Sequence, residues 1–184
     1  YFVYVLHYSD IATKCAEKGI DLVSMDMIPR TTLAQKMDVL SSQANIAGYK
    51  SVILAANELG KIFPLMMTAA GTISPAKVVI MGAGVAGLQA LGTAKRLGAV
   101  VEVSDIRTAV KEEVQSLGGR FIEVEGAEDM QDAGGYAKEA SPEFLQKQKA
   151  TIFKHVTEAD IVITTALVPG KKAPILVSEE MVKH

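Results

Sequence analysis

The sequence predicts an α/β protein: a doubly wound parallel sheet, preceded by part of a second α/β domain and joined to it by a long helix. Three observations carry this prediction. Short β-branched runs alternate with helical stretches, a glycine-rich turn joins one such run to the helix after it, and an unusually long helical pattern lies upstream. Strands that alternate with helices pair in parallel through right-handed crossovers.

The composition is that of a soluble globular protein. The chain has 184 residues, a net charge of -2, 22% charged residues and 49% apolar residues. This balance gives no electrostatic footprint for nucleic acid, and no apolar run approaches the roughly 20 residues that a membrane helix needs. One cysteine and three scattered histidines exclude a disulfide framework and favour no metal site. The start lacks the features of a signal peptide, and we expect these residues to be a segment of a longer protein.

Residues 1–29 are predicted to be part of a first α/β domain. Ser9 or Asp10 would cap its helix, Gly19 would stop it, and Pro29 would end the unit. The predicted elements are a strand at 2–8, a helix at 9–19 and a strand at 20–28.

Residues 30–76 are predicted to be connecting helices, and residues 77–184 a second domain that is incomplete at its C-terminal end. Gly71 and Pro75 would close the second connecting helix. The predicted helices are 30–60, 63–77, 85–98, 108–119 and about 142–156, and the predicted strands are 77–82, 99–105, 120–125 and 160–167.

The stretch VVIMGAGVAGLQA carries glycines in G-x-G-x-x-G spacing between a buried strand and a helix. Gly82 allows a tight turn, Gly84 lets the backbone approach a diphosphate, and Gly87 lets the helix pack close to the strand. The first amides of the following helix favour an anion. This context indicates a dinucleotide-binding Rossmann unit; a glycine turn without a ligand and a methyltransferase-type fold remain alternatives.

Asp105 ends the strand after this helix, near the spacing of about 20 residues expected for an acid that binds ribose hydroxyls. A carboxylate there would repel a 2′-phosphate, so the sequence predicts NAD(H) over NADP(H). Arg107 could soften that preference or contact a phosphate. A plain turn residue is the alternative for Asp105.

Two loops are candidates for covering the nucleotide. Residues 126–143 are longer than an ordinary connection and carry Gly135 and Tyr136, so they are either a lid or a surface loop without function. Residues 164–174 follow a strand, where ligands of doubly wound sheets lie. Ala166 and Leu167 would be apolar neighbours there, unless this is only a structural turn.

The helical pattern at 30–60 has an unusual polar side. On a helical wheel Gln35, Asp38, Ser42 and Asn45 fall together, with Ser41 at their edge and apolar residues opposite. A solvated face is the ordinary interpretation, but Lys and Glu would then be expected. With Arg30 at its start, this side is interpreted as a face that orients a carboxamide and a phosphate.

These motifs together resemble a known family. RTTLAQKMDVLSSQANIAGYKSV, MMTAAGT, GAGVAGLQA, GGYAKE and TTALVPGKKAP resemble the NAD(H)-binding domain, or alpha subunit, of the proton-translocating NAD(P) transhydrogenases, in the alanine dehydrogenase/transhydrogenase family. The resemblance covers essentially the whole chain, and its most specific stretch is the Arg-x-x-x-x-Gln-x-x-Asp-x-x-Ser run.

The resemblance implies hydride transfer from NADH to NADP⁺ on a partner domain, coupled to proton movement through a membrane domain. It implies an NAD(H) cofactor, no side-chain acid or base, and a homodimer. It also implies a soluble part of an inner-membrane complex, on the bacterial cytoplasmic side or the organelle matrix side. The implied NAD(H) contacts are Arg30, Thr31, Thr32, Gln35, Asp38, Ser41, Gly82, Gly84, Val85, Ala86, Gly87, Asp105, Ile106, Arg107, Gly135, Tyr136, Gln148, Ala166 and Leu167.

Two other functions stay open at this point. An alanine dehydrogenase-like enzyme would need Arg, Lys and His residues for an amino or oxo acid upstream of Tyr1. A non-catalytic NAD-binding module would bind NADH without transferring hydride.

Overall fold

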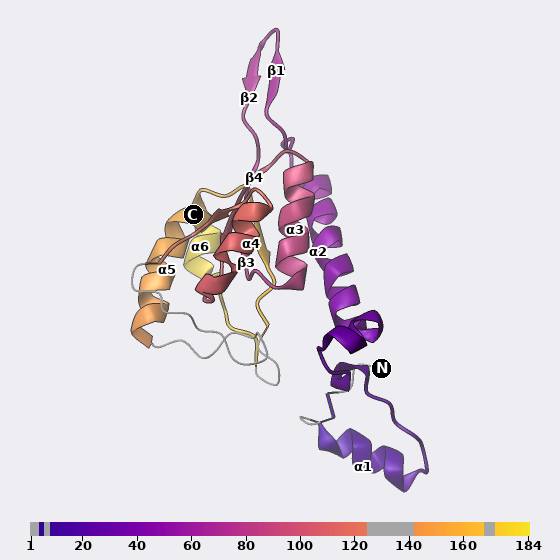
Figure 1. The fold of residues 1–184 in the computed structure, drawn as a ribbon. Helices are drawn as coiled ribbons and strands as arrows, with labels where there is room; N and C mark the ends of the chain where they lie inside the picture. The colour runs from indigo at the N-terminus through magenta and orange to yellow at the C-terminus, as the bar shows by residue number, and fades with distance from the viewer. Residues whose placement is uncertain (1–3, 6–7, 125–141, 168–171) are drawn as a thin grey trace.

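A four-stranded parallel sheet forms the centre of the molecule (Figure 1). The structure, a computed structural model, describes residues 4–5, 8–124, 142–167 and 172–184. The strands follow the order β5-β4-β3-β6, and Val78 of β3 pairs with both Val101 and Ile161. The bounds are Lys77–Met81 for β3, Val100–Ser104 for β4, Arg120–Phe121 for β5 and Ile161–Thr164 for β6. The predicted doubly wound fold is confirmed, with β5 shorter than expected.

Helices cover both faces of this sheet, because the strands are apolar on both sides. Val78 and Ile80 pack against the face that carries α2, α3 and α4, whereas Val79 and Met81 pack against the face of α5 and α6. The bounds are Val39–Glu58 for α2, Val85–Arg96 for α3, Lys111–Ser116 for α4, Pro142–Thr157 for α5 and Glu179–Lys183 for α6. A 3₁₀ turn, Thr108–Val110, precedes α4, and α6 had no counterpart in the sequence prediction.

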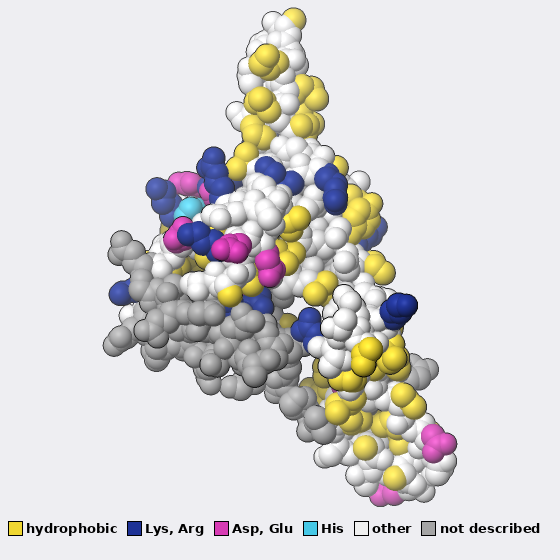
Figure 2. Space-filling view, in the orientation of Figure 1, with side chains coloured by type: hydrophobic (Ala, Val, Ile, Leu, Met, Phe, Trp, Pro, Cys, Tyr) yellow, Lys and Arg dark blue, Asp and Glu magenta, His cyan; other side chains and the backbone are white. Residues whose placement is uncertain are grey.

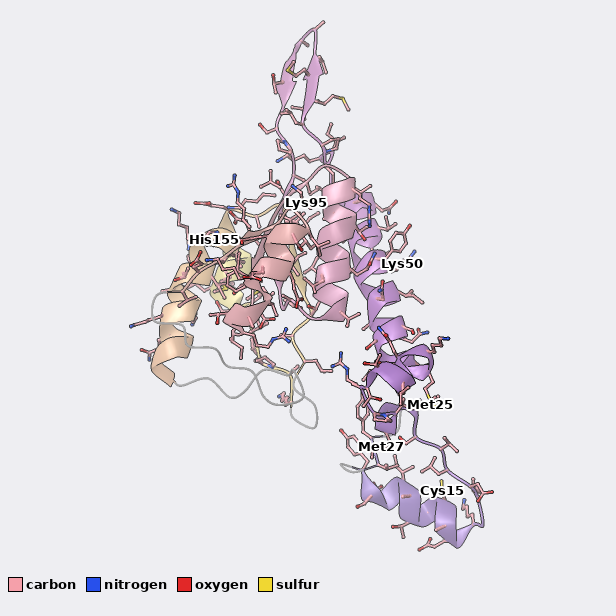
Figure 3. All side chains as sticks on the ribbon, viewed as in Figure 1. Cys15, Met25, Met27, Lys50, Lys95 and His155 are labelled. Carbon is pink, nitrogen blue, oxygen red and sulfur yellow. The ribbon has the colours of Figure 1, made fainter. Side chains whose placement is uncertain are left out.

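A buried carboxylate fixes α5 to its face of the sheet. Glu102 of β4 accepts hydrogen bonds from His155 Nδ1 at 2.8 Å and pairs with Lys77 Nζ at 3.1 Å. Burial by itself raises the pKa of Glu102, but the bonds from His155 and Lys77 lower that pKa below its ordinary value. Figure 3 shows His155 on the side of the sheet away from α2, so this cluster is structural rather than part of the glycine-turn region.

Helix α2 runs beside α3 in the same direction, and its first half continues past the start of α3 (Figure 1). Buried Val52 and half-buried Ala56 of α2 share one apolar cluster with Ala90 and Ala94 of α3. The helix predicted to start near residue 30 begins only at Val39, because Asp38 caps it: the Asp38 carboxylate accepts from Ser41 N at 2.9 Å. Residues Thr32–Met37 form a separate 3₁₀ helix.

A projecting β-hairpin replaces the second connecting helix, so the prediction of a helix at 63–77 was wrong. Strands β1, Met66–Thr68, and β2, Gly71–Ile73, pair antiparallel. Gly71 has φ +136°, which an L side chain rarely adopts, and the Thr68 hydroxyl donates to its carbonyl at 2.9 Å. This local turn chemistry outweighs helix propensity, and the hairpin exposes apolar side chains at the top of the molecule (Figure 2).

In the N-terminal segment the predicted helix forms, the predicted strand at 20–28 does not, and most of the predicted strand at 2–8 lies outside the described residues. Helix α1, Ser9–Glu17, forms as expected and ends before Gly19, whose φ is +64°. Its N-cap is Tyr8, without a side-chain cap, so the predicted Ser9 or Asp10 cap was wrong. Residues 20–28 are not a strand, and a 3₁₀ turn, Met25–Met27, lies among them. Val23 and Met27 are exposed there, since no neighbouring strand or layer packs against them in the described part of the chain.

None of the helices in the described part of the chain combines the length and apolar composition that a bilayer crossing requires.

Candidate functional site

The glycine turn lies at the carboxyl end of β3, held between the ends of β4 and β6. Gly82 has φ +108°, and its amide donates to Ser104 O at 2.8 Å. Its carbonyl accepts from the Thr165 hydroxyl at 2.8 Å. A Cβ on Gly82 would lie 2.9 Å from Ala166 N, so conformation and space both require glycine here.

Gly87 and Gly84 have opposite surroundings. A Cβ on Gly87 would overlap the Gly82 carbonyl oxygen and lie 3.0 Å from Thr165 Oγ1, so Gly87 allows α3 to start against the turn. A Cβ on Gly84, by contrast, would meet nothing within 4 Å. The fold therefore needs glycine at 87, whereas at 84 the missing side chain leaves open space.

That open space lies at the positive end of α3. Gly84 is the N-cap of α3, and no described side chain caps the helix. The first-turn amides, which include those of Val85 and Ala86, carry the partial positive charge of a helix N-terminus. Bare amides beside a space that a Cβ would fill fit the close approach of a diphosphate. The residues present thus fit the diphosphate of a dinucleotide.

Asp105 follows β4 beside this turn, and its carboxylate accepts four hydrogen bonds. Its oxygens accept from Ala83 N at 2.7 Å, Arg107 N at 2.9 Å, Arg107 Nε at 2.9 Å and Arg107 Nη2 at 2.8 Å. Burial by itself raises the pKa of Asp105, but these bonds and the Arg107 charge lower that pKa below its ordinary value. Asp105 is therefore an anion in the structure, and Ile106 beside it is half-buried.

The middle of α2 packs closely against the first turn of α3 at Gly48. A Cβ on Gly48 would overlap the Ala86 carbonyl oxygen and lie 2.9 Å from its carbon. Ser41 precedes Gly48 by seven residues, so it lies on the same face of α2, about two turns and 10 Å closer to the helix start. That face of α2 therefore continues past the start of α3.

Arg30, Asp38 and Ser41 come together at this end of α2. The Asp38 carboxylate accepts from the Ser41 hydroxyl at 2.7 Å, and Arg30 Nε lies 4.0 Å from Asp38 Oδ2. The Asp38 side chain is 15% exposed, and that of Arg30 is 43% exposed. The cluster presents a guanidinium, a carboxylate and a hydroxyl at one point.

The other residues of the predicted polar face add no side chain bound to the Asp38 carboxylate among the described contacts. Gln35 lies in the 3₁₀ helix rather than on α2, so the helical-wheel grouping that included it was wrong. Ser42 and Asn45 are on α2 and both exposed; the Ser42 hydroxyl donates to the main-chain carbonyl of Asp38 at 2.9 Å rather than to its carboxylate. Thr31 and Thr32, before and at the start of the 3₁₀ helix, are exposed as well.

The remaining predicted contacts are only partly described. Ala166 is half-buried against Gly82, and Leu167 is exposed. Gly135 and Tyr136 lie outside the described residues, as does the side chain of Gln148, which belongs to α5.

Three positions of structural importance escaped the sequence analysis. Gly48 holds two helices in close contact, Thr165 ties the glycine turn to β6, and the Ala83 amide donates to Asp105. A glycine inside a helix was the available signal for Gly48, because glycine weakens a helix interior unless something needs the space. Thr165 and Ala83 gave no such signal.

Replacing Asp38 with alanine is expected to lower the free energy of unfolding by about 1 kcal/mol at pH 7, the usual loss for an N-cap. Bonds from the Ser41 hydroxyl and amide hold the pKa of Asp38 below its ordinary value of 3.8. The stabilisation is thus present above that value and is lost as the pH falls through the lower folded-state pKa. Urea unfolding of both proteins between pH 7 and pH 3 measures it.

Asp38→Asn is the matched control, because asparagine caps helices as well as aspartate does. It should lose less stability than Asp38→Ala at pH 7. Equal losses in the two variants would contradict the capping role.

The comparisons with known proteins agree with this geometry. The family model described as "Alanine dehydrogenase/PNT, C-terminal domain" matches residues 51–184. The chain is 55% identical over 168 residues to an alpha-subunit polypeptide of the NAD(P) transhydrogenase of Rhodospirillum rubrum, covering 90% of this chain and 44% of that protein.

Two solved structures have the same fold. A transhydrogenase from Sinorhizobium meliloti has 48% identity and a TM-score of 0.84, over 98% of this chain and 48% of that one. An L-alanine dehydrogenase has 25% identity and a TM-score of 0.65, over 95% of this chain and 43% of that one. The chain thus spans less than half the length of each of these relatives.

Proposed function

The chain belongs to the alanine dehydrogenase/PNT family, and on that premise we propose that it is the NAD(H)-binding component of a proton-translocating NAD(P) transhydrogenase. The single observation that carries the proposal is the contact between Gly48 and Ala86. It supports the proposal because it fixes α2, whose first turns carry Asp38 and Ser41 with Arg30 nearby, against the first turn of α3, which no described side chain caps. The higher identity to transhydrogenase subunits than to an alanine dehydrogenase supports this choice.

Each component of the site has a role in this proposal. The first amides of α3 bind the diphosphate at Gly84, and Asp105 offers acceptors to the adenosine ribose. Arg30, Asp38 and Ser41 orient the carboxamide of the nicotinamide ring. NAD(H) supplies the hydride for NADP⁺ on a partner domain, so the side chains position a ring and need not move a proton.

The assembly around the chain belongs to the same proposal. We propose an NADP(H)-binding domain and a membrane domain as partners, a homodimer, and a place on the bacterial cytoplasmic side or the organelle matrix side of an inner membrane. The division into 1–29, 30–76 and 77–184 also stays a prediction.

Gly84→Ala separates ligand binding from folding. Its backbone, φ -80° and ψ -170°, suits any residue, and the added Cβ meets nothing in the protein. The protein should therefore fold, with a melting temperature only a few degrees lower because alanine is a poorer N-cap than glycine. The methyl group would stand where the diphosphate approaches, so we expect the NADH dissociation constant to rise more than about tenfold, the loss of one charge-assisted hydrogen bond or more. Calorimetry on the full-length protein measures it.

The same preparation tests the reaction. Mixed with its NADP⁺-loaded partner domain, the wild-type protein should transfer hydride from an NADH analogue, and Gly84→Ala should do so poorly. NADH binding without transfer would support a non-catalytic module instead. Turnover of pyruvate and ammonia with NADH would identify an alanine dehydrogenase and refute the proposal.

A further inference from the structure

The hydroxyl of Thr165 lies inside the glycine turn, and the role inferred for it rests on the proposed function. We propose that Thr165 is a positioning residue for diphosphate binding. Its hydroxyl fixes the orientation of the peptide between Gly82 and Ala83, and this peptide in turn directs the first amides of α3 toward the diphosphate of a dinucleotide. Thr165 acts through the main chain and needs no contact with the ligand.

The Thr165 hydroxyl occupies space that two glycines leave. Its oxygen lies 2.8 Å from the place of a Cβ on Gly82 and 3.0 Å from the place of one on Gly87. It donates to the Gly82 carbonyl at 2.8 Å, whereas the Met81 carbonyl is farther away at 3.4 Å. In the described part of the chain no other donor reaches the Gly82 carbonyl. The two glycines therefore make room for this hydroxyl as well as for the turn.

The same peptide is held at its other end by Asp105. The Ala83 amide donates to the Asp105 carboxylate at 2.7 Å. The C=O and N–H of a trans peptide point in opposite directions, so Thr165 after β6 and Asp105 after β4 hold the peptide plane from two sides. These two strands flank β3, from which the turn begins. The plane can rotate only if one of the two bonds breaks.

The orientation of this peptide matters because the binding amides come directly after it. Gly84 follows Ala83 and is the N-cap of α3. The Gly82 carbonyl oxygen lies between Thr165 and Gly87, inside the turn. Without the hydroxyl this carbonyl would lack a donor, which is costly for a buried group, and the turn would shift to find one. Donors that are ordered before binding give a higher affinity than donors that must be ordered by the ligand.

Two variants of the full-length protein, Thr165→Val and Thr165→Ala, test the inference. Valine keeps the branched shape without the hydroxyl, and alanine also avoids crowding the Gly82 carbonyl. Both should raise the NADH dissociation constant about threefold to tenfold, the range of one neutral hydrogen bond, and Thr165→Ser should restore it. Hydride transfer at saturating NADH to the NADP⁺-loaded partner domain should keep its wild-type rate, because the nicotinamide ring is held from α2.

Thr93→Val is the matched control. The Thr93 hydroxyl donates to the Gln89 carbonyl at 2.8 Å within α3, so this variant also loses a threonine bond to the main chain but leaves the turn intact. Its NADH affinity should equal that of the wild type. In hydrogen exchange of the nucleotide-free proteins, the Ala83 amide should exchange faster in Thr165→Val than in Thr93→Val or the wild type.

Calorimetry, stopped-flow transfer and hydrogen exchange give distinct outcomes. Unchanged NADH affinity in Thr165→Val and Thr165→Ala overturns the inference, as does a loss that serine does not restore. Equal losses of affinity in Thr165→Val and Thr93→Val also overturn it, because affinity would then follow stability and not the turn. A wild-type protein that binds no NADH would instead refute the proposed function. Circular dichroism confirms that each compared variant is folded, and the alanine and serine variants decide the matter if valine prevents folding.

Discussion

Replacing Gly87 with alanine is expected to abolish measurable NADH binding and to lower the free energy of unfolding by about 3 kcal/mol, the upper end of overpacking costs. The new Cβ would overlap the Gly82 carbonyl oxygen and lie 2.9 Å from its carbon. These are backbone atoms, which no rotamer change can move away. Helix α3 would have to withdraw from the turn, and its first amides would then no longer point to the space at Gly84. Urea unfolding and calorimetry with NADH measure the two effects.

Gly92→Ala is the matched control for Gly87→Ala. It lies on the same helix, and its added Cβ would meet only Arg96 Nη1 at 3.7 Å, an ordinary contact. Alanine favours a helix interior over glycine by about 1 kcal/mol, so this variant should be as stable as the wild type or more so, with unchanged NADH affinity. If Gly92→Ala lost as much stability and NADH affinity as Gly87→Ala, the losses at Gly87 would come from an alanine anywhere in α3 and not from the overlap with the glycine turn.

The central βαβ unit could be predicted from the sequence because its signals are local. A run such as Lys77–Met81 is apolar at consecutive positions, which predicts a strand buried on both faces. The glycines that follow it specify the turn and the start of α3. Parallel pairing with β4 then follows from the length of the crossover, and the structure has that order.

The N-terminal segment could not be predicted in the same way, because a strand depends on neighbours. Runs at 2–8 and 20–28 have the composition of strands, yet the described residues there pair with no other strand. Composition records a preference, whereas a sheet also needs a partner and a covering layer. The β-hairpin formed by β1 and β2 is the reverse case: the sequence there predicted a helix, but the turn residues between the two strands bring them together as a pair.

The sequence predicted some neighbours in the candidate site and missed others, because it does not show where a helix begins. The sequence placed Arg30 and Asp38 together, and the structure brings them to within 4.0 Å. It also placed Gln35 on the same helix, since a helical wheel carries no information on where a helix begins. The Asp38 cap sets that boundary, and it gives the expected binding acid a structural role as well.

Replacing Gly48 with alanine is expected to lower the rate of hydride transfer about a hundredfold, which is what a displacement of about 1 Å at a reacting group can cost. The added Cβ would overlap the Ala86 carbonyl oxygen and lie 3.0 Å from Ala86 Cα. Helix α2 would therefore move away from the start of α3 and carry Ser41 and Asp38 with it. Stopped-flow transfer from an NADH analogue to the NADP⁺-loaded partner domain measures the rate.

Comparing NADH with ADP-ribose shows whether α2 supports the nicotinamide end or the diphosphate end of the site. ADP-ribose lacks the nicotinamide ring, and Gly48→Ala should weaken its binding less than that of NADH. Gly60→Ala is the control, because Gly60 follows the same helix and a Cβ there meets nothing within 4 Å. It should leave both affinities and the rate unchanged. Equal weakening of ADP-ribose and NADH in Gly48→Ala would mean that α2 supports only the glycine turn, and that the Arg30, Asp38 and Ser41 cluster does not hold the nicotinamide ring.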